Sequence, residues 1–153
     1  MRALLILIIA LGAAAARADA VPGRILKVLP FLVDQQGRIA KSPSLFDRDA
    51  YQAYLRLHTN DVAALRYDVL WKAPKAPAES WKIAVELRGV GTNGTPKLVT
   101  LETNVVYGKG AFGQWTSIPL ADDAFRNFGG VAAWRVRLWK GGQMFSEQQS
   151  FLW

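Results

Sequence analysis

Few residues of the kinds that usually perform catalysis occur in this chain of 153 residues. It contains a single histidine, His58, and no cysteine. Thiol catalysis and thiolate metal sites are therefore excluded, and one histidine falls short of the roughly three or four ligands that a zinc site takes. The sequence also lacks the G-x-S-x-G turn in which many hydrolases present their serine. We expect a protein that is not an enzyme, with no metal and no cofactor, and we interpret His58 as a structural residue.

Paired carboxylates are the next candidates, because calcium sites and glycoside hydrolases both use them. Asp122–Asp123 is the one adjacent acidic pair in the sequence, and Asp47 and Asp49 form a second close pair. Neither pair has the spacing of a calcium-binding loop. We expect Asp122 to cap a short helical turn, with calcium binding as the alternative. A small hydrolase that gathers Asp122, Asp123 and His58 in one pocket is a more remote alternative.

Tryptophan is the enriched residue type, with six in the chain. Three have the inward parity of their predicted strands and are expected in the core: Trp71, Trp81 and Trp134. Three lack this parity: Trp115, Trp139 and Trp153. Carbohydrate-binding sandwich domains stack sugar rings on exposed aromatic side chains, so the second group are candidate ligand-contact residues. We expect Trp115 in the opposite sheet from Trp139, which disfavours one extended platform and leaves open whether Trp139 and Trp153 cover core or meet a partner.

The elements that must position these residues are mostly strands. Residues 65–72 and 81–88 alternate apolar and polar side chains with period two, which is typical of half-buried strands. A turn with two prolines separates them, and we expect neighbouring antiparallel strands of one sandwich. Pro30 and Pro119 cannot donate to a strand ladder: Pro30 predicts an edge position or a switch between sheets, and Pro119 predicts a strand end or an edge. Further strands are predicted over residues 24–34, 98–107, 114–120 and 134–139.

The last strand continues into a hairpin at Gly141–Gly142. A two-residue type I′ turn there, which needs positive φ, would place Glu147 opposite Val136. A three-residue loop over 140–142 would instead pair Arg135 with Glu147. The second register gives the better charge match, and we favour it.

One segment changes from the strand period to the helix period. In residues 47–58, Tyr51, Tyr54, Leu55 and His58 follow the spacing of one helix face. We expect Asp47 to be the N-cap and the short helix to lie across an open end of the sandwich. With about seven short strands, this pattern predicts an all-β, antiparallel sandwich with one short helix inserted after the first strand.

Two stretches carry resemblances. Residues 120–139, LADDAFRNFGGVAAWRVRLW, resemble the passage into the penultimate strand of immunoglobulin-like domains, and Trp71 and Trp81 flank the position of the B-to-C connection. This resemblance covers residues 62–153 and implies an immunoglobulin-like fold, although the inter-sheet disulfide of antibody domains is missing. SPSLFDRDAYQAYLR and the terminal SFLW resemble small exported bacterial proteins with no assigned function, which implies a location and a fold but no activity.

The N-terminal residues predict export. Arg2 precedes an apolar run of 14 residues, Ala3–Ala16, which is shorter than the roughly 20 that a membrane-spanning helix needs. The small-x-small pattern that follows predicts a signal peptide over residues 1–18, cleaved after Ala18 or Ala20, with an uncleaved anchor as the alternative. Residues 22–153 would then be a single domain, in the periplasm or outside the cell, with no stable membrane span.

Charge narrows the class of partner. The chain carries +7, and loss of Arg2 and Arg17 leaves +5, spread along the sequence without the basic cluster of a nucleic-acid-binding protein. A soluble basic surface is one interpretation, and attraction to anionic envelope polymers or lipid headgroups is the other. We expect an exported, non-catalytic binding, adhesion or accessory module of the cell envelope that contacts a protein or a polysaccharide. A carbohydrate-binding module that uses Trp115, Trp139 or Trp153 is the alternative.

Overall fold

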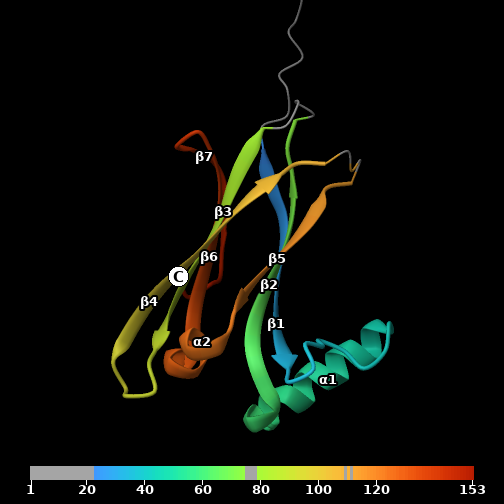
Figure 1. Cartoon of the computed structure of the whole chain (residues 1–153), viewed down its shortest axis with the longest axis vertical. Helices are drawn as coiled ribbons and strands as arrows, with labels where there is room; N and C mark the ends of the chain where they lie inside the picture. Colours follow the sequence, from blue (N-terminus) through green and yellow to red (C-terminus); the bar gives the residue numbers. More distant parts are fainter. Residues whose placement is uncertain (1–22, 75–78, 109, 111) are drawn as a thin grey trace, which may run out of the picture.

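The structure is a computed structural model that describes residues 23–74, 79–108, 110 and 112–153. The predicted signal peptide and its cleavage positions lie outside these residues. The described residues form seven strands and two α-helices (Figure 1). In chain order the elements are β1 (Arg24–Asp34), α1 (Leu45–Leu57), the 3₁₀ turn η1 (Thr59–Asp61), β2 (Val62–Lys72), β3 (Ser80–Val90), β4 (Pro96–Val106), β5 (Gln114–Leu120), α2 (Asp122–Phe128), β6 (Gly130–Lys140) and β7 (Gln143–Gln149).

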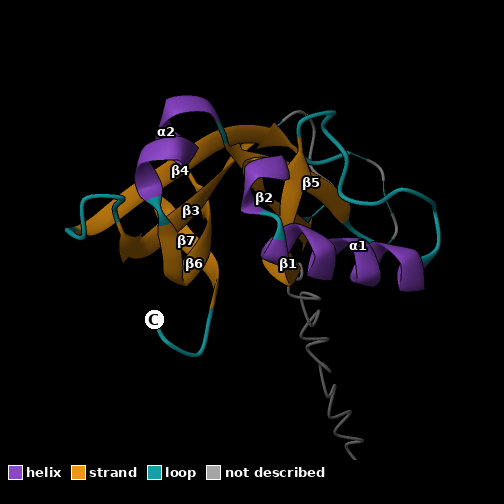
Figure 2. Cartoon of the chain, turned by 90° about the horizontal axis from the view of Figure 1, so that it is seen from below, coloured by secondary structure: helices purple, strands orange, loops and turns teal. Residues whose placement is uncertain are grey.

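The strands form two antiparallel sheets that pack face to face. One sheet has the order β1-β2-β5 and the other the order β4-β3-β6-β7, which confirms the predicted antiparallel sandwich and is compatible with an immunoglobulin-like fold. As expected, β5 lies in the opposite sheet from the β6–β7 hairpin. The consecutive strands β2 and β3 are not hydrogen-bonded neighbours, because they lie in different sheets and face each other across the core. Figures 1 and 2 show α1 and α2 at the same end of the sandwich.

The core lies between the sheets, and the period-two alternation explains its composition. Trp71 on β2 is fully buried, and its indole Nε1 donates to Thr116 Oγ1 at 2.9 Å, so that its polar atom is satisfied. Its ring lies 6.2 Å from Trp81 of the facing sheet. Trp134 also points inward and lies 6.2 Å from Tyr67, but it is only half-buried. The largest fully buried side chains are Trp71, Tyr67, Phe128, Leu55, Ile83, Leu87, Leu120, Leu138, Val69, Val85 and Val136.

The closing hairpin has neither of the two expected registers throughout. A two-residue turn forms at Gly141–Gly142, with φ of 54° and 82°, and a register shift follows within two residues of it. Arg137, not Arg135, therefore lies opposite Glu147. The extra residue is Phe145, which packs edge-on against the Trp81 ring at a centroid distance of 5.2 Å. The favoured three-residue loop was wrong, because this aromatic contact between β7 and β3, on the inner face of the same sheet, favours the bulge.

The caps of both helices differ from the predicted ones. α1 begins after Ser44, whose hydroxyl accepts a hydrogen bond from the Asp47 backbone N–H at 3.4 Å, so Asp47 lies inside the helix. α2 begins after Ala121, and no side chain caps it. Asp122 is not an N-cap but the first residue of α2, with φ of 54°.

Candidate functional site

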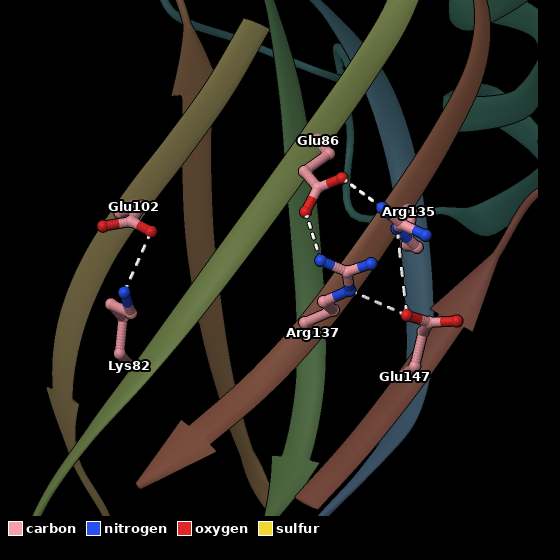
Figure 3. A network of polar contacts seen from close by, with 6 residues as sticks. All are labelled: Lys82, Glu86, Glu102, Arg135, Arg137 and Glu147. Atoms are coloured by element: carbon pink, nitrogen blue, oxygen red, sulfur yellow. Dashed lines mark hydrogen bonds and ion pairs between the residues drawn. The ribbon is translucent and has the colours of Figure 1, made fainter. Parts of the chain in front are cut away.

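A network of paired charges covers the outer face of the four-stranded sheet (Figure 3). Glu86 on β3 accepts hydrogen bonds from Arg135 at 2.5 Å and from Arg137 at 2.7 Å, both on β6. Arg137 also donates to Glu147 on β7 at 2.7 Å. These residues come from three adjacent strands and point to the same side, because cross-strand neighbours share a face. The network ties β3, β6 and β7 together through side chains as well as through the backbone ladder.

A shallow groove of about 610 Å³ lies beside this network. Trp139 lines it from β6, and Lys82 of β3 lies with its Nζ 6.0 Å from the Trp139 ring. Lys82 is also paired with Glu102 of β4 at 3.0 Å, as Figure 3 shows. The groove therefore combines aromatic residues, of which Trp139 belongs to the candidate ligand contacts, with polar groups that donate and accept hydrogen bonds. Its other polar lining residues include Glu86, Thr100, Asn104 and Arg137.

The three candidate tryptophans do not meet. Trp115 is half-exposed on the outer face of the three-stranded sheet, away from Trp139. Trp153 lies over the four-stranded sheet against two guanidinium groups, with its ring centroid 4.0 Å from Arg88 and 4.3 Å from Arg135. These two cation–π contacts favour this position of the ring. Of the three, Trp139 is the one that lines a groove.

The four edge strands of the sandwich are β1, β5, β4 and β7. Edge strands expose unpaired backbone groups, and proteins usually protect them with proline, a bulge, short length or a covering element. β1 carries Pro30 and two register irregularities, and β5 has seven residues and carries Pro119. β7 also has seven residues and contains the bulge at Phe145. Three of the four edges are therefore protected by their own sequence.

β1 and β7 are protected further by contacts with each other and with α1. The Ile25 N–H donates to Ser146 Oγ at 3.0 Å, and Gln148 Nε2 donates to the Ile25 carbonyl at 3.4 Å. The Leu32 N–H donates to the side chain of Gln52 of α1 at 2.8 Å. These contacts close this side of the sandwich.

β4 is the edge with the least protection along its length: its inward-facing Lys97, which donates to the Asn127 carbonyl of α2 at 2.7 Å, lies at the second residue, and no proline, bulge or charge on the inner side follows it. It has eleven residues, pairs with β3 without a break in register, and has its proline at its first position. On its other side, Gln114 Nε2 donates to the Val106 carbonyl at 3.1 Å, at the last residue of the strand. The inward-facing Val99, Leu101 and Val105 are half-buried rather than buried. β4 thus exposes unpaired backbone groups, and its inward side chains at the edge of the core are only partly covered.

A buried carboxylate network, which the sequence analysis missed, holds α1 on β1. Asp34 is 2% exposed and accepts hydrogen bonds from the Tyr51 hydroxyl at 2.7 Å and from the Arg38 guanidinium and backbone N–H, both at 2.8 Å. Burial alone raises the pKa of Asp34, but these bonds and one from the Gln36 N–H outweigh it and lower the pKa from 3.8 to about 2. The turn that follows Asp34 is the one sequence signal for this role.

The helix face that contacts the sandwich also differs from the predicted one. Tyr51, Gln52 and Leu55 are buried, whereas Tyr54 and His58 are exposed. Gln52 Nε2 donates to the Leu32 and Ile39 carbonyls, each at 2.9 Å. A buried glutamine is uncommon, and here its amide is fully used on backbone groups.

His58 and the acidic pair are not brought together. His58 is the C-cap of α1, stacks on Tyr54 at 3.9 Å and contacts the Tyr54 carbonyl through Nδ1 at 2.9 Å. Asp123 is paired with Arg126 at 2.7 Å on α2. Three hollows on the described surface are lined by neither His58 nor Asp122 nor Asp123. Among the described residues, no group of three or more histidine, cysteine or acidic side chains could hold a metal ion.

Neither helix of the described chain has the length and apolar character needed to cross a membrane. Comparison of the chain with models of known families, with curated proteins and with solved structures found no match.

Proposed function

We propose that the chain is an exported, non-catalytic binding module with an immunoglobulin-like sandwich, and that it takes an extended segment of an envelope protein as an additional strand beside β4. The single observation that carries this proposal is the edge of β4, which after its first two residues has no proline, bulge or inward-facing charge, in a sandwich whose other three edges are protected. Strand addition uses backbone hydrogen bonds for affinity and alternating side chains for specificity. Export itself is proposed from the signal-peptide pattern of residues 1–18.

The side chains of β4 indicate what kind of segment would fit. On the inner side, Val99, Leu101 and Val105 would be covered by apolar side chains of the added strand, which removes their half-exposed surface from water. On the outer side, Leu98 is 63% exposed and Glu102 is neutralised by Lys82. We therefore propose a partner segment that alternates apolar and uncharged polar residues.

Hydrogen exchange of the ¹⁵N-labelled protein, followed by NMR with unlabelled envelope extract, tests the proposal. We expect alternate backbone amides of β4 to become about tenfold or more protected, because an added strand pairs with every second residue. Thr103→Lys places an inward-pointing charge on the edge and should abolish this protection. Met144→Lys is the matched control, because it adds the same charge to β7, and it should leave the protection unchanged.

Two results would contradict strand addition. Unchanged exchange of β4 at saturating extract shows that this edge takes no partner, and equal protection at every β4 position indicates a side-chain contact instead. Protection that appears in the isolated protein and rises with its concentration would assign the edge to a second copy of the chain.

A second candidate function is carbohydrate binding, and the groove beside Trp139 favours it. Sugar rings stack on flat aromatic faces, while carboxylate, amide and guanidinium groups bind their hydroxyls. Glu102, Asn104 and Arg137 supply these groups within the same groove. Trp153 is occupied by its two arginines, and Trp115 lies on the other sheet, so Trp139 is the residue that we assign to ligand contact.

Titration of a glycan panel by tryptophan fluorescence tests this second candidate. We expect a saturable change with one class of polysaccharide, and Trp139→Ala should weaken its binding about two- to twelvefold, since a stacked ring contributes about 0.5–1.5 kcal/mol beyond its buried area. Trp115→Ala should leave the affinity unchanged. Absence of a saturable response across the panel would rule the candidate out.

A further inference from the structure

The sandwich is open at the end where α1 and α2 lie. A cleft of about 840 Å³ runs between the two sheets there, with β1, β2 and α1 on one side and α2 and β6 on the other. Figure 2 views the molecule from this end and shows both helices on the near side. The volume lies within the range of clefts that bind small ligands, roughly 300–1,000 Å³. Its lining residues are Pro30, Leu32, Gln52, Arg56, Thr59, Asn60, Val62, Leu65, Thr92, Leu120, Phe125, Arg126, Phe128, Gly129 and Val131.

The floor of the cleft is a continuation of the core. Leu120 and Phe128 are each 1% exposed and close it from below. Leu65, Phe125 and Val131 pack against the same core but remain partly exposed. In a complete sandwich such inward-facing side chains would be covered by the opposite sheet, so this surface is apolar and accessible to an apolar ligand.

Both charged residues that line the cleft are arginines. Arg56 of α1 and Arg126 of α2 line it from the two sides, and no carboxylate is among its lining residues. Arg126 is paired with Asp123, but the two side chains are 68% and 87% exposed, and an exposed pair of this kind contributes little. Thr59, Asn60 and Thr92 add neutral groups that can bind the oxygens of a ligand. The electrostatic complement of this rim is an anion.

We propose that the end cleft binds a single-chain anionic amphiphile. The apolar chain would lie between the sheets, against Leu65, Phe125 and Val131, and the anionic head would contact Arg56 and Arg126. The head is a carboxylate or a phosphate, since guanidinium groups bind both through paired N–H donors. This site shares no residue with β4, so the proposal is independent of strand addition.

Calorimetric titration with soluble amphiphiles, all below their critical micelle concentrations, tests the site. The probes are laurate, lauroyl lysophosphatidylglycerol and monolaurin, which share one chain and differ in the head. We expect both anionic probes to bind with a stoichiometry of one and monolaurin to bind at least about tenfold more weakly. Tighter binding of laurate assigns a free fatty acid, and tighter binding of the lysolipid assigns a lipid headgroup.

Two variants separate the contribution of the amphiphile's apolar tail to binding from that of its anionic head. The double variant Arg56→Gln with Arg126→Gln should lose about tenfold or more in affinity for both anionic probes and little for monolaurin. Val131→Phe fills the cleft and should weaken all three probes, with thermal unfolding as the check that it folds. The control is Arg24→Gln with Lys27→Gln, which removes two exposed charges of β1 outside the cleft and should leave binding unchanged.

The proposal is overturned by binding that appears only above the micelle concentration, by equal affinities for anionic and neutral probes, or by an unchanged affinity in the arginine double variant. Saturation of the cleft by an acidic amphipathic peptide, with no binding of the amphiphiles, would overturn it in favour of a protein ligand. Chemical-shift changes on addition of an amphiphile that are confined to residues outside the cleft would show that the amphiphile binds elsewhere.

Discussion

Replacement of Asp34 by alanine is expected to lower the free energy of unfolding by about 3 kcal/mol at pH 7. The carboxylate is 2% exposed and accepts from the Tyr51 hydroxyl and from the side chain and backbone of Arg38. Alanine leaves the Tyr51 hydroxyl and the Arg38 backbone N–H without this acceptor, and a donor that loses its partner in a largely buried place is costly. Urea denaturation followed by circular dichroism measures the change.

The same residue predicts a dependence of stability on acid pH. Its pKa is about 2 in the folded protein and 3.8 when unperturbed, so the folded state favours the ionised form. A lowered pKa stabilises the fold above the unfolded value, and this contribution, about 2 kcal/mol, is lost as the pH falls from about 5 to 2. Asp34→Asn cannot titrate there, so the difference between the two proteins should shrink over this range. Parallel curves for wild type and Asp34→Asn would contradict this account.

Replacement of Gly129 by alanine is expected to lower the free energy of unfolding by at least about 3 kcal/mol. Gly129 has φ of 72° and ψ of −119°, a conformation that residues with a Cβ rarely adopt. A Cβ at this position would also collide with the Val90 carbonyl at the end of β3. Because Gly129 links α2 to β6, relief of the collision would shift one end of the central β3–β6 pair. Thermal and urea unfolding measure the loss.

Gly94→Ala is the matched control for this prediction. Gly94 also has a positive φ, 78°, but a Cβ added there would meet nothing within 4 Å. Alanine should therefore lower the free energy of unfolding only by the backbone strain, about 1–2 kcal/mol. Equal losses at the two positions would show that the collision with Val90 does not contribute.

Strand positions could be predicted from the sequence where one face of a strand is buried and the other is not. On β3, Trp81, Ile83 and Val85 alternate with Lys82 and with other outward residues, and this contrast alone indicates the inward face. The same logic placed Trp115 on an outer face. It could not predict the pairing of β6 with β7, because the bulge depends on Phe145 reaching the Trp81 ring of another strand.

Buried polar residues were the main feature of the structure that sequence patterns did not predict. Asp34 and Gln52 are of types that usually lie on the surface, and nothing local distinguishes them from exposed residues. Their burial follows from α1 packing on β1, which is a tertiary event. The helix cap was misassigned for a related reason, since Ser44 and Asp47 are both favourable cap residues and only the backbone conformation selects Ser44.

The candidate binding surfaces could not be predicted from sequence patterns either. Whether a strand is an edge depends on sheet order, and the sequence of β4 resembles that of any half-buried strand. The end cleft joins Leu32, Leu65 and Val131, which come from three strands in two sheets. Trp153 could not be placed either, because the two arginines that hold it lie on β3 and β6.

The separation of β4 from the end cleft has a consequence for avidity. No residue of β4 lines the cleft, so a strand bound at the edge does not block an amphiphile bound at the end. If both proposals hold, one small domain is a bivalent adapter between a protein and a lipid. Once the first is engaged, capture of the second becomes an intramolecular step governed by effective concentration, so that two weak contacts give lasting attachment without a large interface.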